Sequence, residues 1–273
     1  MMIPRTLTLS FLIMSCLAAS SALALDPNES DARKIMEAVN ARPSGDKAIG
    51  RMDIQVKDSA GRTRTRTVHT WSIDFKLGTK RLMLFADPAD VRNTGLLSID
   101  YDDGNKSDDQ WLYLPSLRKS TRIAGSDKSG SFMGTDLTYS DMTKADINHY
   151  SYTLLKPSVT VGGDDCWLIE ARPKTQKAKD ETGYVKSQLW VSKSKLMPLQ
   201  AKAWVREGRK IKQTKFANVE KIDGIWFARK ILARTLRGKS VESMTKIVFT
   251  TMKFNQASVS EKDFTERRLE QGL

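Results

Sequence analysis

Alternation of polar and apolar residues dominates the chain from about residue 51 to residue 254. The clearest case is RTRTRTVHTWSIDFK at 62–76, where one parity carries mostly charged or hydroxyl side chains. The other parity carries Trp71, Ile73 and Phe75. A period of two predicts a long antiparallel strand with one wet face and one apolar face. We expect the face with Trp71, Ile73 and Phe75 to point into the fold, and the arginine run to be a solvated strand face.

The same pattern recurs along the chain, interrupted by turn sequences such as DSAG, DDG and GGDD. It predicts further strands near 51–57, 80–86, 95–101, 110–114, 119–124, 149–156, 165–171, 184–192, 197–206, 210–219, 225–236 and 241–254. Short connections favour pairing between consecutive strands. The predicted fold class is mainly β, a large antiparallel sheet, and a sheet of about a dozen strands must curl or split.

Two segments are candidates to cover the concave face of a curled sheet. The first is a helix in DPNESDARKIMEAVNARP, with Asp26 as N-cap, Pro27 at the first helical position and Pro43 at its end. Its apolar residues recur at helical spacing, namely Ala32, Ile35, Met36 and Val39. One apolar stripe requires burial, so we expect this helix to lie on the sheet.

The second candidate is GSFMGTDLTYSDM at 130–142. It is too apolar for a plain loop and too rich in glycine for a stable helix. We expect its apolar side chains to plug the mouth of the curled sheet as a movable cover: Phe132, Met133, Leu137, Tyr139 and Met142. The alternative is an ordinary Ω-loop over a small satellite core.

The N-terminal residues predict an exported protein. Arg5 precedes a short apolar run, and Ala22 and Ala24 fit an A-x-A cleavage site, so residues 1–24 form a signal peptide cleaved after Ala24. A lipoprotein signal that uses Cys16 is the rival interpretation. Residues 25–273 then form a single domain, with Cys166 as its lone cysteine in a predicted strand. A lone cysteine forms no internal disulfide, and we expect it in the core.

The chain is strongly basic, with a net charge of +13. Arg5 is the only charged residue of the predicted signal peptide. An exported protein rarely meets nucleic acid, and the chain has no basic and aromatic binding motif. Attraction to an anionic membrane surface or to an acidic partner fits better. A basic surface that merely maintains solubility is the other interpretation.

Motifs for catalysis and cofactor binding are missing from the sequence. There is no G-x-G-x-x-G, Walker loop or G-x-S-x-G. The two histidines, His69 and His149, have no ligand-spaced neighbours, so we expect no metal. The acidic pairs at 102–103, 108–109 and 164–165 are explained by turn chemistry. The sequence favours a binding protein without a cofactor over an enzyme.

Several motifs resemble one known family. WLYLPSLRKSTRI at 111–123 and the following SGSFMGTDLTYSDM look like the outer-membrane lipoprotein-sorting (LolA/LolB-like) family, in the branch associated with RND/MMPL-type exporters. LWVSKSKLMPLQAKAWVREGRKIKQ, EKIDGIWFARKI and NQASVSEKDFT agree with this pattern, so the resemblance runs from about residue 30 to residue 270. It implies an unclosed β-barrel with a concave apolar face covered by helices, and no cofactor.

The resemblance also implies a function, a periplasmic carrier or chaperone for a lipid-like or acylated ligand in a Gram-negative envelope. We expect it to serve an inner-membrane RND/MMPL-type exporter. We expect the ligand to contact Trp71, Ile73, Phe75, Trp111, Tyr113, Phe132, Met133, Leu137 and Tyr139. In the strand QWLYLP, Leu112 and Leu114 could point inward instead of Trp111 and Tyr113. An envelope-stress sensor of lipoproteins and a cofactor-free enzyme on the same scaffold are the alternative functions.

Overall fold

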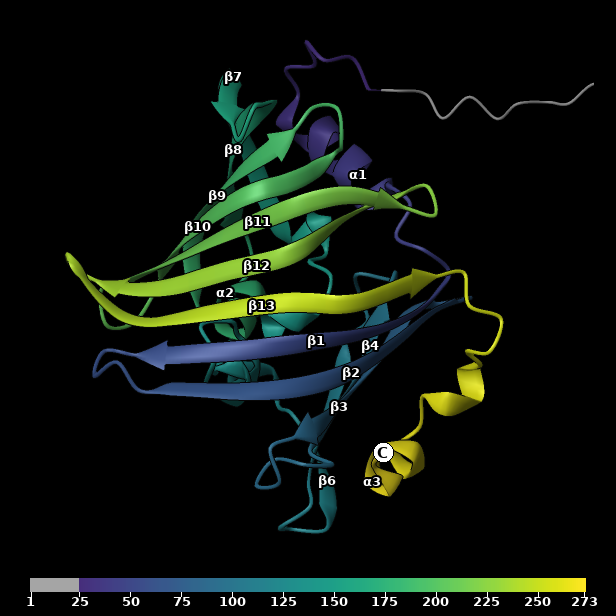
Figure 1. Ribbon diagram of the computed structural model, residues 1–273. Helices are drawn as coiled ribbons and strands as arrows, with labels where there is room; N and C mark the ends of the chain where they lie inside the picture. The colour runs from purple at the N-terminus through teal and green to yellow at the C-terminus, as the bar shows by residue number, and fades with distance from the viewer. Residues whose placement is uncertain (1–24) are drawn as a thin grey trace, which may run out of the picture.

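The structure is a computed structural model that describes residues 25–273 (Figure 1). The predicted signal peptide and its cleavage site at Ala24 lie outside the described residues. A single antiparallel sheet of thirteen strands forms most of the molecule. No helix of residues 25–273 combines the length and apolar character that a membrane crossing requires.

The thirteen strands lie where the alternation of the sequence predicts them. Their bounds are β1 Lys47–Asp58, β2 Thr63–Phe75, β3 Gly78–Asp87, β4 Gly95–Tyr101, β5 Asp109–Leu114, β6 Lys119–Arg122, β7 Tyr150–Val161, β8 Asp164–Pro173, β9 Tyr184–Ser192, β10 Met197–Val205, β11 Lys210–Ile222, β12 Ile225–Arg237 and β13 Ser240–Phe254. The predicted bounds for β4 and β9 agree with the structure residue by residue. The mainly β fold class is confirmed.

The strand order differs from a simple meander at one place. The sheet runs β6-β5-β4-β3-β2-β1-β13-β12-β11-β10-β9-β8-β7. Consecutive strands pair everywhere else, but β1 pairs with β13, and β6 and β7 lie at opposite ends of the sheet. Hydrogen bonds therefore do not close the sheet, and the connection between β6 and β7 crosses its open side.

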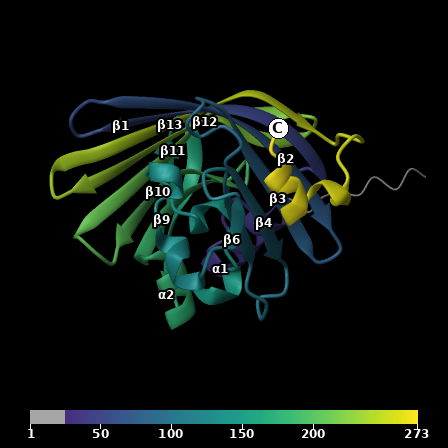
Figure 2. The same cartoon turned by 90° about the horizontal axis from the view of Figure 1, so that it is seen from below.

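The curled sheet has a concave face and a convex face (Figure 2). The concave face carries Met52, Met83 and Ile247 and faces the connection between β6 and β7. That connection, the insertion 123–149, consists of short 3-10 turns: η1 Gly125–Ser129, η2 Phe132–Gly134, η3 Ser140–Met142 and η4 Ile147–His149. The predicted cover over the concave face is therefore present.

Helix α1 (Ala32–Ala41) covers one end of the concave face, as predicted. Its Ala32 and Ile35 pack with Trp167, Ile169 and Val191 of the sheet. The prediction of its start is wrong, because the N-cap is Asp31, whose carboxylate accepts from the amides of Arg33 and Lys34. Asp26 instead accepts from the amide of Asn28 in a turn that precedes the helix.

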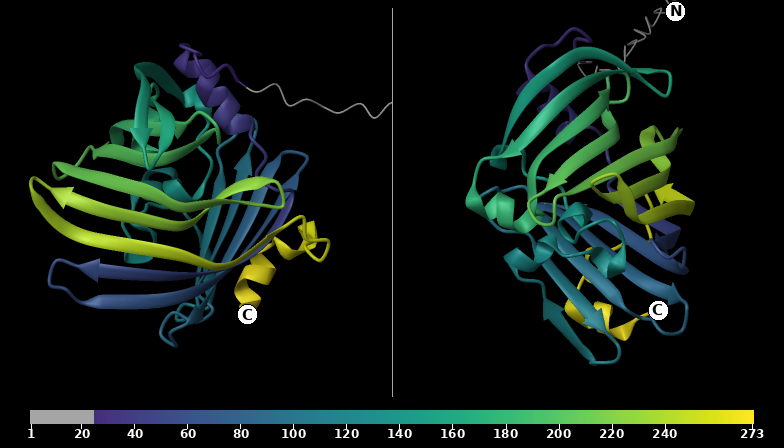
Figure 3. Two further views of the ribbon diagram at one scale, coloured as in Figure 1. Left: turned by 45° about the horizontal axis from the view of Figure 1, so that its top comes forward. Right: turned by 90° about the vertical axis from the view of Figure 1, so that its left-hand side faces the viewer.

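The convex face is covered only in part (Figure 3). The C-terminal segment after β13 ends in α3 (Glu266–Gln271) and packs outside β2–β6. Its Val259, Phe264 and Leu269 are almost fully buried. A short helix, α2 (Gln176–Thr182), connects β8 to β9 and packs against η1 and η3 of the insertion. The sequence analysis missed both α2 and α3.

Candidate functional site

A cavity of about 570 Å³ lies on the concave face, between the sheet and the insertion. Strands from both halves of the sheet contribute to its wall, and so do residues of α1 and α2. Its volume falls in the range of roughly 300–1,000 Å³ that small-molecule sites occupy. The curl of the sheet and the crossing of the insertion together create the cavity, so neither half of the chain forms it alone.

One part of the cavity is apolar. Its walls include Met52, Met83, Phe132, Leu137, Phe216, Ile231, Ile247 and Phe249. Most of these residues belong to the central core cluster or pack on it. Methionine is flexible and polarizable, so a wall with methionines can adapt to ligands of different shape.

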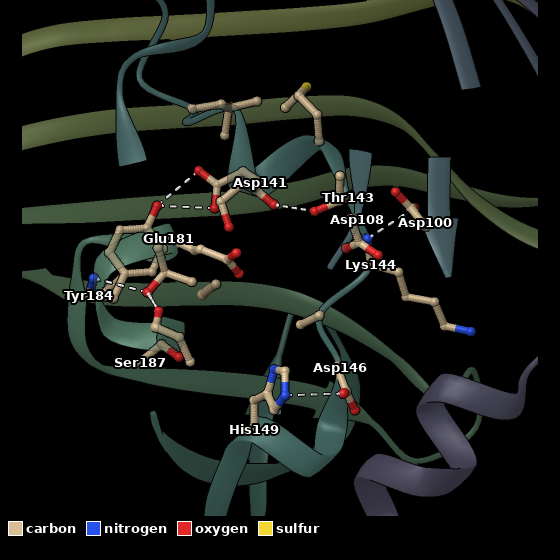
Figure 4. Close-up of a pocket in the computed structure, with 18 of the residues that line it drawn as sticks. Asp100, Asp108, Asp141, Thr143, Lys144, Asp146, His149, Glu181, Tyr184 and Ser187 are labelled. Atoms are coloured by element: carbon tan, nitrogen blue, oxygen red, sulfur yellow. Dashed lines mark hydrogen bonds and ion pairs between the residues drawn. The ribbon is translucent and has the colours of Figure 1, made fainter. Parts of the chain in front are cut away.

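The other part of the cavity is polar and lies near α2 and η4 (Figure 4). The hydroxyl of Tyr184 donates to the carboxylate of Asp141, at 3.0 Å and 2.9 Å from its two oxygens. In η4, His149 Nε2 lies 3.6 Å from Asp146 Oδ2. The cavity is therefore amphipathic, with an apolar wall on the central strands and donors and acceptors near the insertion.

Three tyrosines of the polar part remain neutral donors at ordinary pH. Burial raises the pKa of Tyr150 to about 12. Burial likewise raises the pKa of Tyr152 and of Tyr184 well above the usual value for a phenol. An uncharged phenol can hydrogen-bond to the polar group of a ligand without the desolvation cost of a buried charge.

Charged residues of the polar part differ in how they are compensated. Arg81 forms an ion pair with Asp100, which also accepts from the amide of Lys144 at 3.2 Å. Asp108 accepts from the amide of Tyr101, and burial raises its pKa. Lys212, on the concave side of β11, forms no ion pair among the described residues, and burial lowers its pKa. A polar ligand group can therefore meet both acidic and basic side chains.

The segment 130–142 is folded into a compact plug. Phe132 and Leu137 are buried in the central core cluster, where the Phe132 ring contacts Phe85 and Tyr139. Ser131 bridges to Thr138, and Arg66 donates to the carbonyl of Met133 at 2.5 Å. These contacts confirm that the apolar residues of the segment face the sheet.

A buried carboxylate fixes this plug to the sheet. Asp136 is 2 % exposed and accepts hydrogen bonds from Thr235, Ser243 and Thr245 on β12 and β13. Its amide also donates to the Thr245 hydroxyl at 2.9 Å. The sequence analysis missed this anchor, because the three hydroxyls lie about a hundred residues from Asp136 in the chain.

The predicted inner face of the sheet is wrong. Trp71 and Ile73 lie on the convex face, where they pack with Leu97 and the C-terminal segment. Trp111 and Tyr113 lie on that face too, so Leu112 is on the concave side, opposite Leu96. Phe75 contacts Tyr101 at the end of β2 and does not line the cavity.

Trp71 and Ile73 were assigned to the wrong face because β2 carries apolar residues on both of its faces. Val68 lies among the alternate positions that are otherwise polar. It is fully buried in the concave core and pairs with Phe85. Val68 was the one signal in the sequence for the true orientation. Of the nine predicted ligand contacts, Phe132 and Leu137 line the cavity, and Met133 and Tyr139 pack on the central core cluster. Whether any of the nine contacts a ligand stays a prediction.

The remaining candidates have plain structural positions. Cys166 is fully buried in β8, and burial raises the pKa of its thiol to about 11, so the predicted core position is confirmed. His69 is half-buried and stacks on Trp71. Among residues 25–273, no group of three or more His, Cys, Asp or Glu side chains is placed to hold a metal ion.

An open antiparallel sheet curled around an internal cavity and covered by a helix and an insertion defines a LolA-like fold. A family model described as "uncharacterized protein" matches residues 78–271, and the chain belongs to that family. No curated protein matches the sequence.

Solved structures agree with this assignment. A domain from Vibrio parahaemolyticus assigned as an outer membrane lipoprotein-sorting protein is 29% identical, with a TM-score of 0.78, over 88% of this chain and 98% of that one. A DUF1329 family protein from Desulfovibrio piger is also 29% identical, with a TM-score of 0.77, over 87% and 97%. A LolA superfamily protein from Nitrosomonas europaea, 19% identical, shares the fold with a TM-score of 0.64 over 86% and 97%. The resemblance to the lipoprotein-sorting (LolA-like) proteins is confirmed, and the assignment to the branch associated with RND/MMPL-type exporters stays a prediction.

Proposed function

We propose that the protein is a carrier in the bacterial envelope that shelters a lipid-like or acylated ligand in its concave cavity. The observation that carries the proposal is the amphipathic cavity of about 570 Å³ between sheet and insertion. Its apolar wall suits an acyl chain, and its phenols and charged side chains suit the polar end of an amphiphile. The lipoprotein-sorting relative with 29% identity supports the same class of ligand.

Exchange of such a ligand with a membrane is energetically balanced. Burial of one CH₂ group contributes roughly 0.8 kcal/mol, so a 16-carbon chain gains about 12 kcal/mol before ordering costs. A bilayer offers the same chain a similar gain. A carrier therefore needs a cavity that its own side chains partly fill, so that ligand release is not prohibitively slow. Phe132 and Leu137 of the plug supply this filling.

The test uses two neighbouring residues of β10 that face opposite sides of the sheet. Ala201 lines the cavity and pairs with Leu189 and Thr214. Gln200 pairs with Trp190 and Lys215 on the convex face. We expect Ala201→Trp to fill the cavity and weaken the binding of a fluorescent long-chain fatty acid at least tenfold. Gln200→Trp introduces the same side chain outside the cavity and should bind the probe normally.

Two results would contradict the proposal. One is no probe binding by the unsubstituted mature chain. The other is equal binding by both tryptophan variants at equal thermal stability, which would place the ligand elsewhere. Native mass spectrometry of protein purified from the envelope, followed by lipid extraction, would identify the natural ligand.

The location and partner are part of the same proposal. The carrier works in the periplasm after removal of residues 1–24, without a cofactor and without catalysis, and serves an inner-membrane exporter of the RND/MMPL type. The support is the resemblance of 111–142 to that branch of the family. Crosslinking in cells followed by identification of the membrane partner tests it, and turnover of a lipid substrate would contradict the carrier role.

A further inference from the structure

A basic surface occupies the uncovered part of the convex face. The C-terminal segment packs outside β2–β6, and Figure 1 views the bare strands β9–β13 and β1 from the convex side. The strand registers place six cationic residues together on this surface: Lys57, Lys202, Lys215, Lys230, Arg234 and Lys246. We call these six residues the basic face.

The charges of the basic face are not compensated. None of the six forms an ion pair among residues 25–273, and only Arg234 has a polar partner, the Gln213 side chain at 2.8 Å. Some other cations of the sheet are paired; Lys186, for example, lies 2.8 Å from Glu170. The basic face therefore carries six positive charges that have no ion-pair partner in the part of the chain described.

Apolar side chains lie among these cations. Leu232 lies between Lys215 and Lys246 in the strand register, and Met244, 43 % exposed, lies between Arg234 and Lys57. Lysine side chains keep an ammonium group at a polar interface while their stems lie on apolar surface.

The distribution of the charges favours a membrane over an acidic protein or a nucleic acid. The six cations come from five adjacent strands, β10 to β13 and β1, so with neighbouring strands about 4.8 Å apart they extend over roughly 20 Å. Five of the six are lysines, which bind phosphates as point charges and without the paired geometry of arginine. A broad field of point charges with interspersed apolar groups matches a bilayer of anionic headgroups.

We propose that the basic face docks the carrier on a bilayer that contains anionic lipids, with the cavity on the opposite side of the sheet. This goes beyond the proposed function, because the docking surface and the cavity are separate and can be tested separately. Docking would hold the carrier at the surface from which it takes its ligand or to which it delivers it. The basic face, and not net charge alone, accounts for the binding.

The experiment measures sedimentation of the mature full chain with vesicles. We expect binding to vesicles of equal parts phosphatidylglycerol and phosphatidylcholine at low salt, loss of binding at high salt, and none to pure phosphatidylcholine. One Lys near an anionic surface contributes about fivefold in affinity. The double variant Lys215→Gln with Lys246→Gln should therefore bind about 30-fold more weakly and still bind the fatty-acid probe in solution.

The matched control removes two charges elsewhere. Lys119 on β6 and Lys179 on α2 are exposed and form no ion pair in the part of the chain described. Lys119→Gln with Lys179→Gln has the same net charge as the first double variant and should bind vesicles normally. Equal weakening in both double variants, normal binding by the Lys215 and Lys246 variant, or no binding by the unsubstituted chain would overturn the proposal.

Discussion

The substitution Asp136→Ala should release the plug from the sheet. Asp136 is buried and accepts from three hydroxyls, with oxygen–oxygen distances of 2.5 Å to Thr235 and 2.6 Å to Thr245. Alanine removes all of these acceptors and leaves the buried Thr235 hydroxyl without a partner, while the Thr245 hydroxyl loses its acceptor and keeps only the hydrogen bond from the amide of residue 136. The apolar contacts of Phe132 and Leu137 and the hydrogen bond from Arg66 to the Met133 carbonyl would then remain to hold the plug.

The magnitude follows from the two fully buried hydroxyls. A hydrogen bond to a charged group contributes about 1.5–3 kcal/mol, so two of them amount to about 3–6 kcal/mol. The variant also avoids the desolvation of a buried carboxylate, which offsets part of this loss. We therefore expect a decrease of about 3 kcal/mol in the free energy of unfolding. Asp136→Asn should lower the free energy of unfolding less, because the side-chain amide oxygen of asparagine can still accept a hydrogen bond.

Urea unfolding measures the loss of stability, and amide hydrogen exchange measures the release of the plug. The unfolding midpoint of Asp136→Ala should fall by about 1 M, for a slope near 3 kcal/mol per molar urea. Amides of 130–142 should exchange faster, while those of β1 and β13 change little. A double-mutant cycle with Thr245→Ala should give a coupling energy above about 0.5 kcal/mol. Unchanged stability and unchanged exchange at 130–142 would refute the anchor.

Three further predictions concern other parts of the molecule. Gly95→Ala should loosen the C-terminal segment and lower the melting temperature, because its Cβ would lie 2.5 Å from Leu269 Cδ1; a normal melting curve would contradict this packing. A hydrogen bond from Lys186 lowers the pKa of Glu170, so its stabilisation is complete above a pH of about 4.5 and is lost as the pH falls through the lowered value. Lys186→Gln should accordingly flatten the pH dependence of thermal stability below pH 4.5, and an unaltered profile would argue against the pair. Cys166 should resist alkylation at pH 8 in the native protein and react after unfolding, since its thiol is buried with a pKa raised to about 11; rapid labelling of the folded chain would show that β8 opens.

The sequence alone determined the local structure of the sheet. Alternation with a period of two and turns rich in glycine and aspartate are properties of neighbouring residues, so all thirteen strands were predicted near their true positions. The start of α1 was misplaced because Asp26, followed by Pro27, and Asp31 both have the chemistry of an N-cap. Only Asp31 has helical residues behind it whose amides its carboxylate reaches.

The tertiary structure alone decided which face of each strand is concave. In β2 both parities are partly apolar, because Val68 packs under the plug while Trp71 and Ile73 pack under the C-terminal segment. Alternation distinguishes two faces but cannot say which one a distant segment will cover. The pairing of β1 with β13, the anchor of Asp136 on hydroxyls of β12 and β13, and the approach of Asp146 and His149 to the cavity likewise join residues far apart in the chain. Those contacts depend on the curl of the whole sheet, which no local pattern encodes.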